Sequence, residues 1–406
     1  MSHSHSLPSP PSGTTRDFTT PQTYTVTASG GAGTKDYTVT ATVGTAPAIF
    51  TWTNPVSDSW SNASNWTNDL GTGTEPGYFG GSNYTLNFTT PGTYSVTNDL
   101  SDGFLLNQLN FDGTVTLDSP AGLNPGGLTF AADGATLPRV NQNSGNAVWI
   151  MVPLNLATNT TVGGTGSGQV TVDKAVSGTG GLTKDGSGTL HLYAEPPSPY
   201  SGGTIINDGT LRLGRFIGGI SKDVIDPVGT GTVTLNDGTL YLGRVKVSNA
   251  LLVNGGKIYQ QNGWGATWSG PVTLNADLSC ETFYTLTISG DISGTGGLTK
   301  TLNGPLKLTG SNDYSGDTTV NAGTLEVYGS SISDAGKLII DGGLVKPNGT
   351  ERVDTLFFGD VQQDAGTYGA TGSGAGTISD AHFSGSAGVV EVLSGPSSGG
   401  SMFFAR

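Results

Sequence analysis

The chain has 406 residues, of which 66 are glycine, 12% are charged and 8% are aromatic. Scarce Lys, Glu, Arg and Met argue against a mainly helical protein, whereas abundant Gly and β-branched residues favour short strands joined by tight turns. The net charge of −14, from 31 acidic and 17 basic residues with no basic cluster, argues against nucleic acid as a partner.

The N-terminal part of the chain predicts a flexible start followed by a β-hairpin. Residues 1–18 have no apolar segment of the kind that a signal peptide needs, so we expect them to be flexible and to carry no export signal. Alternation of Tyr and Val with Thr predicts two strands, at residues 23–28 and 36–43, around Gly30 and Gly31. Since a lone hairpin is marginal in water, we interpret residues 19–47 as the remnant of an immunoglobulin-like or cadherin-like module.

Residues 48–83 are rich in Trp and Asn. Trp52, Trp60 and Trp66 lie close together in the sequence. An exposed platform for sugar rings would explain them, but large rings that close the open end of a β-core explain them more simply. We therefore predict an N-terminal cap.

Residues 84–345 alternate short strands with Gly, Asn or Asp turns. Five triplets have an apolar, polar, apolar pattern that predicts a middle side chain directed to solvent and two neighbours directed inward: Leu190-His191-Leu192, Leu211-Arg212-Leu213, Leu240-Tyr241-Leu242, Leu306-Lys307-Leu308 and Leu325-Glu326-Val327. Recurring turns such as Asn207-Asp208-Gly209 place Gly where the backbone needs a positive φ.

Internal repetition is the strongest signal for one continuous coil. The strings SGTGGLTKDGSGTLHL and SGTGGLTKTLNGPLKL begin two near copies, at residues 176–213 and 292–327, each followed by a second matching strand pair. Their lengths differ in the intervening loop, which reads YAEPPSPYSG in the first copy and TGSNDYSG in the second. At roughly 20 residues a coil, the region would hold about a dozen coils of a β-solenoid, with neighbouring coils paired in parallel.

These two copies resemble the autotransporter-associated β-strand repeat, also called the passenger-associated transport repeat, of bacterial surface proteins. In the second copy Thr301 and Leu302 replace the more usual small turn residues. The resemblance implies an all-β fold, a right-handed parallel β-helix outside the cell, with roles in adhesion, surface architecture or passenger secretion. Residues 346–394 are similar to the segment that closes the helix in such proteins, and residues 395–406 form a tail. A complete autotransporter also has a signal sequence and a membrane barrel, which this sequence lacks, so we expect a fragment of a longer gene or another secretion route.

The sequence offers little support for catalysis. Glycoside hydrolysis needs two carboxylates across a groove, and Asp208 and Asp237 sit in Gly turns where Asp has a structural role. His191 and His382 stand apart from any nucleophile-like Ser or Cys. Cys280 is the single cysteine, so we expect a buried and inert thiol. We predict no enzyme, no cofactor and no metal site.

Binding of surface glycans remains an alternative. Tyr200 and Tyr314 occupy matching loop positions, and Trp264 with Trp268 lies in a Gly-rich loop. Such rings either stack on sugars or cover the seam between loop and coil.

The leading interpretation is a non-enzymatic scaffold or adhesin-like protein, extracellular or at the bacterial cell surface, with no membrane span. One alternative is a self-assembling fibre in which the hairpin's open edge exchanges strands between copies. Another is a glycan-binding module or a polysaccharide-degrading β-helix enzyme. The expected partners are therefore a second copy of the chain or surface glycans.

Overall fold

The computed structural model describes residues 22–27, 33–39, 48–71, 74–120, 127–193, 197–214, 223–261, 263–329 and 331–396. Within these ranges every regular element is a β-strand except η1 (Ala63–Asn65), a 3-10 helix of three residues. The all-β prediction is confirmed. The chain divides into two compact units, Met1–Pro47 and Ala48–Arg406.

The first unit contains the predicted hairpin. Strand β1 (Gln22–Thr27) pairs antiparallel with β2 (Thr34–Val39), with Tyr24 opposite Tyr37. The predicted turn at Gly30 and Gly31 lies outside the described residues. Its origin in an immunoglobulin-like or cadherin-like module stays a prediction.

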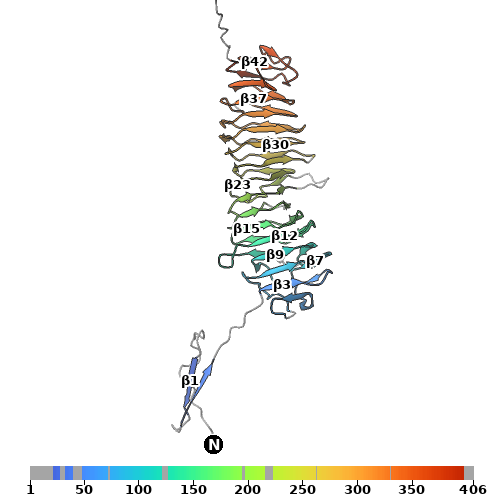
Figure 1. Cartoon of the computed structure of the whole chain (residues 1–406), viewed down its shortest axis with the longest axis vertical. Coiled ribbons are helices and arrows are strands. Elements are labelled where there is room, and N and C mark those ends of the chain that lie inside the picture. Colours follow the sequence, from blue (N-terminus) through green and yellow to red (C-terminus); the bar gives the residue numbers. More distant parts are fainter. Residues whose placement is uncertain are drawn as a thin grey trace, which may run out of the picture. The chain divides into compact units, whose positions relative to one another are not determined.

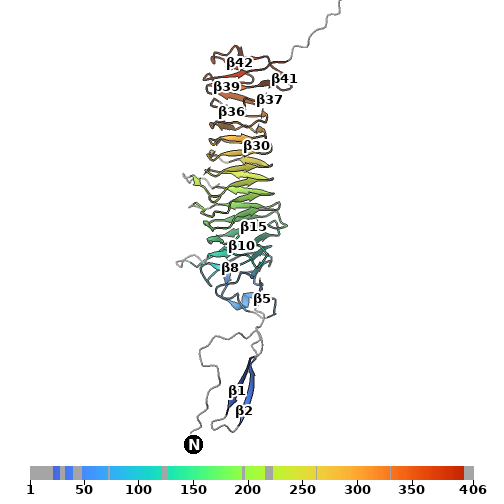
Figure 2. The same cartoon turned by 90° about the vertical axis from the view of Figure 1, so that its left-hand side faces the viewer.

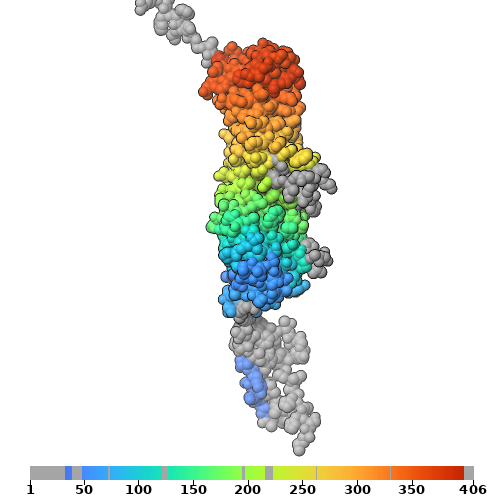
Figure 3. Space-filling model, turned by 90° about the vertical axis from the view of Figure 1, so that its right-hand side faces the viewer, coloured from blue at the N-terminus to red at the C-terminus, as the bar shows by residue number. Residues whose placement is uncertain are grey.

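The second unit is a parallel β-solenoid of about 12 turns, as predicted. Its strands stack from β3 (Ile49–Trp52) at one end to the sheet that contains β42 (Gly366–Gly369) at the other (Figures 1 and 2). In most turns the chain passes through three sheets in a fixed order, which we call face 1, face 2 and face 3. Each strand pairs with the equivalent strand of the next turn, so successive segments appear as stacked bands in Figure 3.

Face 1 is a 12-stranded sheet that ends at β32. Its strands are β3, β5 (Trp66–Asn68), β6 (Thr85–Phe88), β9 (Gln108–Phe111), β12 (Arg139–Gln142), β15 (Thr160–Gly163), β18 (Leu182–Lys184), β20 (Thr204–Ile206), β23 (Val233–Leu235), β26 (Leu251–Val253), β29 (Val272–Leu274) and β32 (Ile292–Gly294).

Face 2 is a 15-stranded sheet and the longest of the three. Its strands are β4 (Asp58–Ser59), β7 (Thr93–Thr97), β10 (Thr114–Asp118), β13 (Val148–Ile150), β16 (Gln169–Val172), β19 (Thr189–Leu192), β21 (Thr210–Leu213), β24 (Thr239–Leu242), β27 (Lys257–Gln260), β30 (Leu278–Thr282), β33 (Leu298–Thr301), β35 (Thr318–Val320), β37 (Lys337–Ile340), β40 (Thr355–Phe358) and β41 (Val361–Gln362).

Face 3 consists of two sheets that occupy the same step of the coil, first one of four strands and then one of seven. The four are β8 (Phe104–Leu106), β11 (Leu128–Phe130), β14 (Leu154–Leu156) and β17 (Val176–Gly178). The seven are β22 (Val224–Ile225), β25 (Val245–Val247), β28 (Ala266–Trp268), β31 (Leu286–Ile288), β34 (Pro305–Leu308), β36 (Thr324–Val327) and β38 (Leu344–Pro347).

At both ends of the solenoid the structure differs from that of the regular coils. Near the first coils Trp52, Trp60 and Trp66 are buried, and the Trp52 and Trp66 rings meet edge to face with centroids 5.1 Å apart. At the other end the chain forms a separate four-stranded sheet. It consists of β39 (Thr350–Val353), β42, β43 (Thr377–Ile378) and β44 (Val389–Val392).

The core follows the apolar, polar, apolar triplets. Leu240 and Leu242 have no exposed surface, whereas Tyr241 between them lies on the outer face. The expectation that every middle side chain reaches solvent is wrong for two of the five. His191 is buried against Tyr193, with ring centroids 5.2 Å apart, and Glu326 is covered by ion pairs with lysines of the adjacent strands. Neighbouring coils are close enough that long outward side chains cover one another.

The two sequence repeats lie on different faces of the coil. The strands of the first copy, β18 to β21, alternate between face 1 and face 2, and those of the second copy, β33 to β36, alternate between face 2 and face 3. In each copy a loop takes the place of the third strand of the turn. The second copy is therefore displaced around the coil by one face relative to the first.

The loops still pair with the coil. The N–H of Ser201 donates to the Gly178 carbonyl at 3.1 Å, and the N–H of Ser315 donates to the Gly294 carbonyl at 2.9 Å. These matching bonds extend the ladder across the loop. In the second copy the bond covers the edge of β32, where face 1 ends.

One turn of the repeat is strained in the second copy. Gly186 has φ +68, and Leu302, which follows Lys300 as Gly186 follows Lys184, has φ +62. A left-handed backbone costs a non-glycine residue about 1–2 kcal/mol. The departure from the repeat pattern noted at Leu302 is thus a site of backbone strain.

We expect Leu302→Gly to stabilise the protein by up to about 1 kcal/mol, because relief of the strain exceeds the extra unfolded-state entropy of glycine, about 0.5–1 kcal/mol. Urea denaturation followed by circular dichroism measures the change. Gly186→Leu is the matched control and should destabilise, since a Cβ there would lie 2.7 Å from the Gly164 carbonyl oxygen. A lower midpoint for Leu302→Gly would contradict the assignment of strain.

Candidate functional site

Three of the four residues singled out from the sequence are buried. Tyr200 and Tyr314 have no exposed surface, and their hydroxyls lie 2.6 Å from Thr204 Oγ1 and Thr318 Oγ1. Burial raises the pKa of both phenols. Trp268 is likewise fully buried, in β28. A glycan cannot reach these rings in this structure, and both tyrosines fill the seam between loop and coil.

Trp264 is the exposed member of the four. Half of its surface, 51%, is open to solvent, and the guanidinium carbon of Arg244 lies 4.7 Å from its ring centroid. Its carbonyl accepts a hydrogen bond of 2.8 Å from the Gln260 side chain, which anchors the turn between β27 and β28. The local fold therefore holds this ring on the outside.

More aromatic rings lie on the outer side of face 2, whose strand β27 leads into the turn that holds Trp264. Tyr241 of β24 is the register partner of Tyr259 of β27, with ring centroids 5.0 Å apart. Phe283, which follows β30 and is 43% exposed, lies 6.2 Å from Tyr259. Three consecutive coils thus contribute one ring each. The sequence analysis missed this row, although Tyr241 already stood in an outward position.

Arg212 and Gln261 contact the rings of this row. Arg212, the partner of Tyr241 on the preceding strand, lies 4.9 Å from its ring centroid. Gln261 accepts hydrogen bonds of 2.7 Å from both phenols, through its carbonyl from Tyr241 and through Oε1 from Tyr259. We call this set the aromatic surface; it comprises Arg212, Tyr241, Arg244, Tyr259, Gln261, Trp264 and Phe283.

Three cations at or next to this surface, Arg244, Lys246 and Lys257, are paired with carboxylates. Asp223 accepts from Arg244 at 2.7 Å and from Lys246 at 2.9 Å, and Glu281 lies 3.0 Å from Lys257. The two cations hold the pKa of Asp223 below its usual value. An ionised, paired carboxylate is a poor general acid. The arrangement suits binding by ring contact and hydrogen bonds.

The carboxylates considered for hydrolysis have local partners. Asp208 Oδ1 accepts from the Gly209 N–H at 2.6 Å, and Asp237 Oδ1 accepts from the Gly238 N–H at 2.7 Å. These are the turn roles expected of them. In the described part of the chain no three His, Cys, Asp or Glu side chains gather as a metal site would require.

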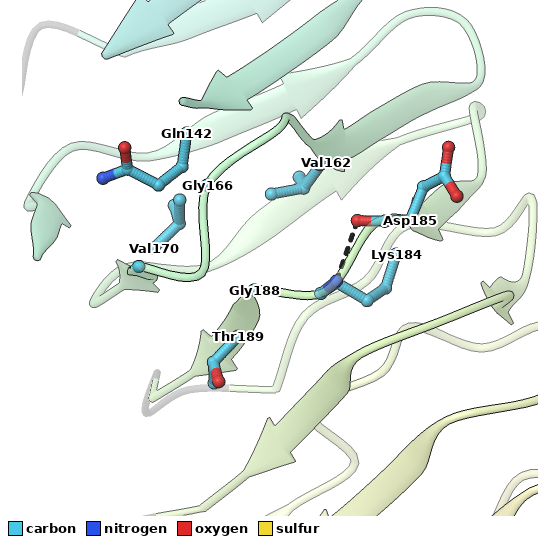
Figure 4. Close-up of a pocket in the computed structure, with 10 residues that line it drawn as sticks. Gln142, Val162, Gly166, Val170, Lys184, Asp185, Gly188 and Thr189 are labelled. Atoms are coloured by element: carbon cyan, nitrogen blue, oxygen red, sulfur yellow. Dashed lines mark hydrogen bonds between the residues drawn. The ribbon is translucent and has the colours of Figure 1, made fainter. Parts of the chain in front are cut away.

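A small hollow beside Lys184 is structural (Figure 4). Its volume of about 10 Å³ suffices for one water molecule. Lys184 Nζ donates to the carbonyls of Asp185 at 2.8 Å, Gly186 at 2.5 Å and Asp208 at 3.3 Å. Lys300 binds the carbonyls of Thr301, Leu302 and Ala322 in the same way. Each repeat therefore contains a buried lysine that ties two successive turns together, a role that the sequence analysis did not identify.

Three other buried groups have shifted pKa values. Burial raises the pKa of the Cys280 thiol to about 12, and the prediction that this thiol is buried is confirmed. Burial lowers the pKa of His191 to about 4, and its Nε2 donates to the Gly214 carbonyl at 2.8 Å. Burial raises the pKa of Glu351 to about 7, although the N–H groups of Ser331 and Ile332 donate to its carboxylate.

Comparison with protein families agrees with the repeat. The model described as passenger-associated-transport-repeat matches residues 182–213 and 298–327. The chain carries the passenger-associated transport repeat. Both matched copies include the buried lysine and the paired strands described above. The resemblance inferred from the sequence is confirmed.

Two further comparisons bear on the whole chain. A model described as SGBP, N-terminal matches residues 2–41. The adhesin BmaC autotransporter of Brucella suis biovar 1 (strain 1330) is 32% identical over 264 residues, which are 62% of this chain and 7% of that protein. The chain with its repeats thus spans a small part of this relative. No solved structure matches significantly, and no helix in the described ranges is long and apolar enough to cross a membrane.

We expect Lys184→Met and Lys300→Met each to destabilise the protein by about 1–3 kcal/mol, because buried carbonyl oxygens lose their donor. Chemical denaturation measures the loss. Lys337→Met is the control, since that side chain is 53% exposed and should change the stability little. Equal midpoints for all three variants would contradict a structural role for the buried lysines.

His191 and Glu351 should give opposite pH dependences of stability. Glu351 has a raised pKa, so its contribution is greatest below its ordinary value of 4.5 and is lost as the pH rises through about 7. His191 has a lowered pKa, so its contribution is present above 6.5 and is lost as the pH falls through about 4. Each effect is on the order of 3 kcal/mol.

The comparison is the slope of the stability against pH between pH 4.5 and 7. This slope should be more positive in Glu351→Gln than in the natural chain, and less positive or negative in His191→Gln. Thermal melts at a series of pH values provide the comparison. Parallel curves for the natural chain and both variants would show that neither group titrates in this range.

Proposed function

We propose that this chain is a segment of a non-enzymatic passenger that acts as an adhesin at the bacterial cell surface. The match to an adhesin autotransporter over 264 residues carries the proposal. The two passenger-associated transport repeats within a parallel β-solenoid support it.

The solenoid is suited to display contact groups far from the cell. Each coil contacts its neighbours through the strand ladder, so the structure can lengthen by adding coils without a new core. Contact groups then lie along an extended surface, and the aromatic surface is one such set. The net charge of −14 keeps a long β-protein soluble and opposes sideways association.

Non-enzymatic action is part of the proposal. The two carboxylates considered for hydrolysis bind their own turns, and Asp223 and Glu281 are paired with cations. Fibre formation through the hairpin and hydrolysis of polysaccharides remain predictions from the sequence, with no contact in the described residues to favour them.

Adhesion can be measured with polystyrene beads that carry the purified chain. We expect such beads to attach to cultured epithelial cells at least several-fold more often than beads that carry serum albumin. Soluble chain should compete with the attachment. Beads with the heat-denatured chain serve as the control for non-specific stickiness. Attachment no greater than that of the albumin beads, on epithelial cells and on bacterial cells alike, would overturn the proposal.

A further inference from the structure

We infer that the aromatic surface binds a linear, uncharged polysaccharide that lies along the axis of the coil. The inference deepens the proposed adhesin function and rests on it for the biological setting. It names the class of ligand and the residues that contact it.

The first argument is the repetition of the rings. Tyr241, Tyr259 and Phe283 come from three consecutive coils, with centroid separations of 5.0 and 6.2 Å. Tyr241 and Tyr259 are register partners on neighbouring strands, which stack about 4.8 Å apart, so these two rings lie along the coil axis. Phe283 extends the row on the next coil from a position two residues past Glu281, the register partner of Tyr259. A polysaccharide also repeats one ring per unit along its length, and the C–H faces of its sugars pack on aromatic rings. The repetition therefore favours a repeating ligand over a compact one.

Trp264 lies in the turn between β27 of face 2 and β28 of face 3 and adds a further exposed ring. Arg244 covers the ring at 4.7 Å and is itself fixed by Asp223. A ring that is already held in place loses little conformational freedom when a ligand binds. Its 51% exposure leaves a large apolar area for contact with a sugar.

The second argument is charge. Arg244 and Lys246 share Asp223, and Lys257 pairs with Glu281, so each of these three cations already has a carboxylate partner. The chain as a whole is strongly acidic, at −14, and repels an acidic polymer. An uncharged polysaccharide needs no cation of the surface as a partner and does not meet this repulsion.

Hydrogen bonding suits hydroxyl-rich ligands. The phenol of Tyr259 donates to Gln261, so its oxygen keeps lone pairs that can accept from a sugar hydroxyl. This acceptor lies next to the rings of Tyr241 and Phe283. A sugar can therefore pack on a ring and donate to its neighbour at once.

Tyr, Trp and Arg are also common in protein interfaces. The repetition of rings from coil to coil has no counterpart in a compact partner. We therefore favour the polysaccharide, and a protein partner is an outcome of the test below.

The test is affinity electrophoresis of the full chain in native gels that contain soluble β-1,4-glucan, β-1,3-glucan, amylose, galactomannan or polygalacturonate. We expect at least one neutral polymer to retard the chain. The variant Tyr259→Ala, Trp264→Ala, Phe283→Ala should bind that polymer at least ten-fold more weakly. Circular dichroism and thermal melting verify that the variant folds.

The matched control is Tyr78→Ala, Phe79→Ala, which removes two rings that are 60% and 75% exposed elsewhere on the molecule. Its binding should equal that of the natural chain. The inference is overturned if no neutral polymer retards the chain, if polygalacturonate binds as well as the neutral polymers, or if the control loses as much binding as the triple variant.

The bead assay separates the two proposals. Retardation by a neutral polymer without attachment to cells would sink the adhesin proposal and leave the inference standing. If the triple variant loses polymer binding but its beads still attach to cells, the adhesin proposal stands, and the residues that contact the cell lie outside the aromatic surface. Attachment that needs the three rings but persists on cells stripped of glycans by glycosidases would indicate a protein ligand and overturn the inference.

Discussion

The backbone hydrogen bonds between successive coils are the constraint on which the second unit depends. Parallel pairing holds each turn in register with the turn before it, so a side chain lies directly above its counterpart. The corners of neighbouring coils must then approach each other as closely as the strands do. At Gly290 an added Cβ would lie 1.9 Å from the Gly270 carbonyl oxygen, so only glycine fits there. Inward aliphatic residues stack for the same reason, and outward residues form rows.

That register explains how a surface can arise from residues far apart in the sequence. Tyr241, Tyr259 and Phe283 belong to three different turns, yet their rings are neighbours because β24, β27 and β30, which Phe283 directly follows, are adjacent in face 2. The same register buries outward groups whose neighbours are large. His191 lies beside Tyr193 and remains uncharged at neutral pH because burial lowers its pKa to about 4.

The repeat illustrates how much variation such a coil accepts. Both copies keep the buried lysine that binds three turn carbonyls and the tyrosine that fills the loop seam. They differ in the face that they occupy, because each replaces a different side of the turn by a loop. A two-strand unit with a loop can sit at any step of a three-sided coil, provided that its strands find partners above and below.

The sequence by itself determined the all-β class, the coil, the two repeats and the burial of Cys280, because glycine turns, alternating apolar positions and internal copies are local signals. Local signals could not show that Trp268 is buried whereas Trp264, four positions earlier, is exposed. That difference depends on how β28 and the turn before it pack on the coil. Nor could local signals reveal that Tyr200 and Tyr314 point inward, or that Lys184 is buried. Those outcomes, and the row of rings on face 2, were decided by the tertiary structure, because the distance between side chains of different turns is set by the strand pairing between coils.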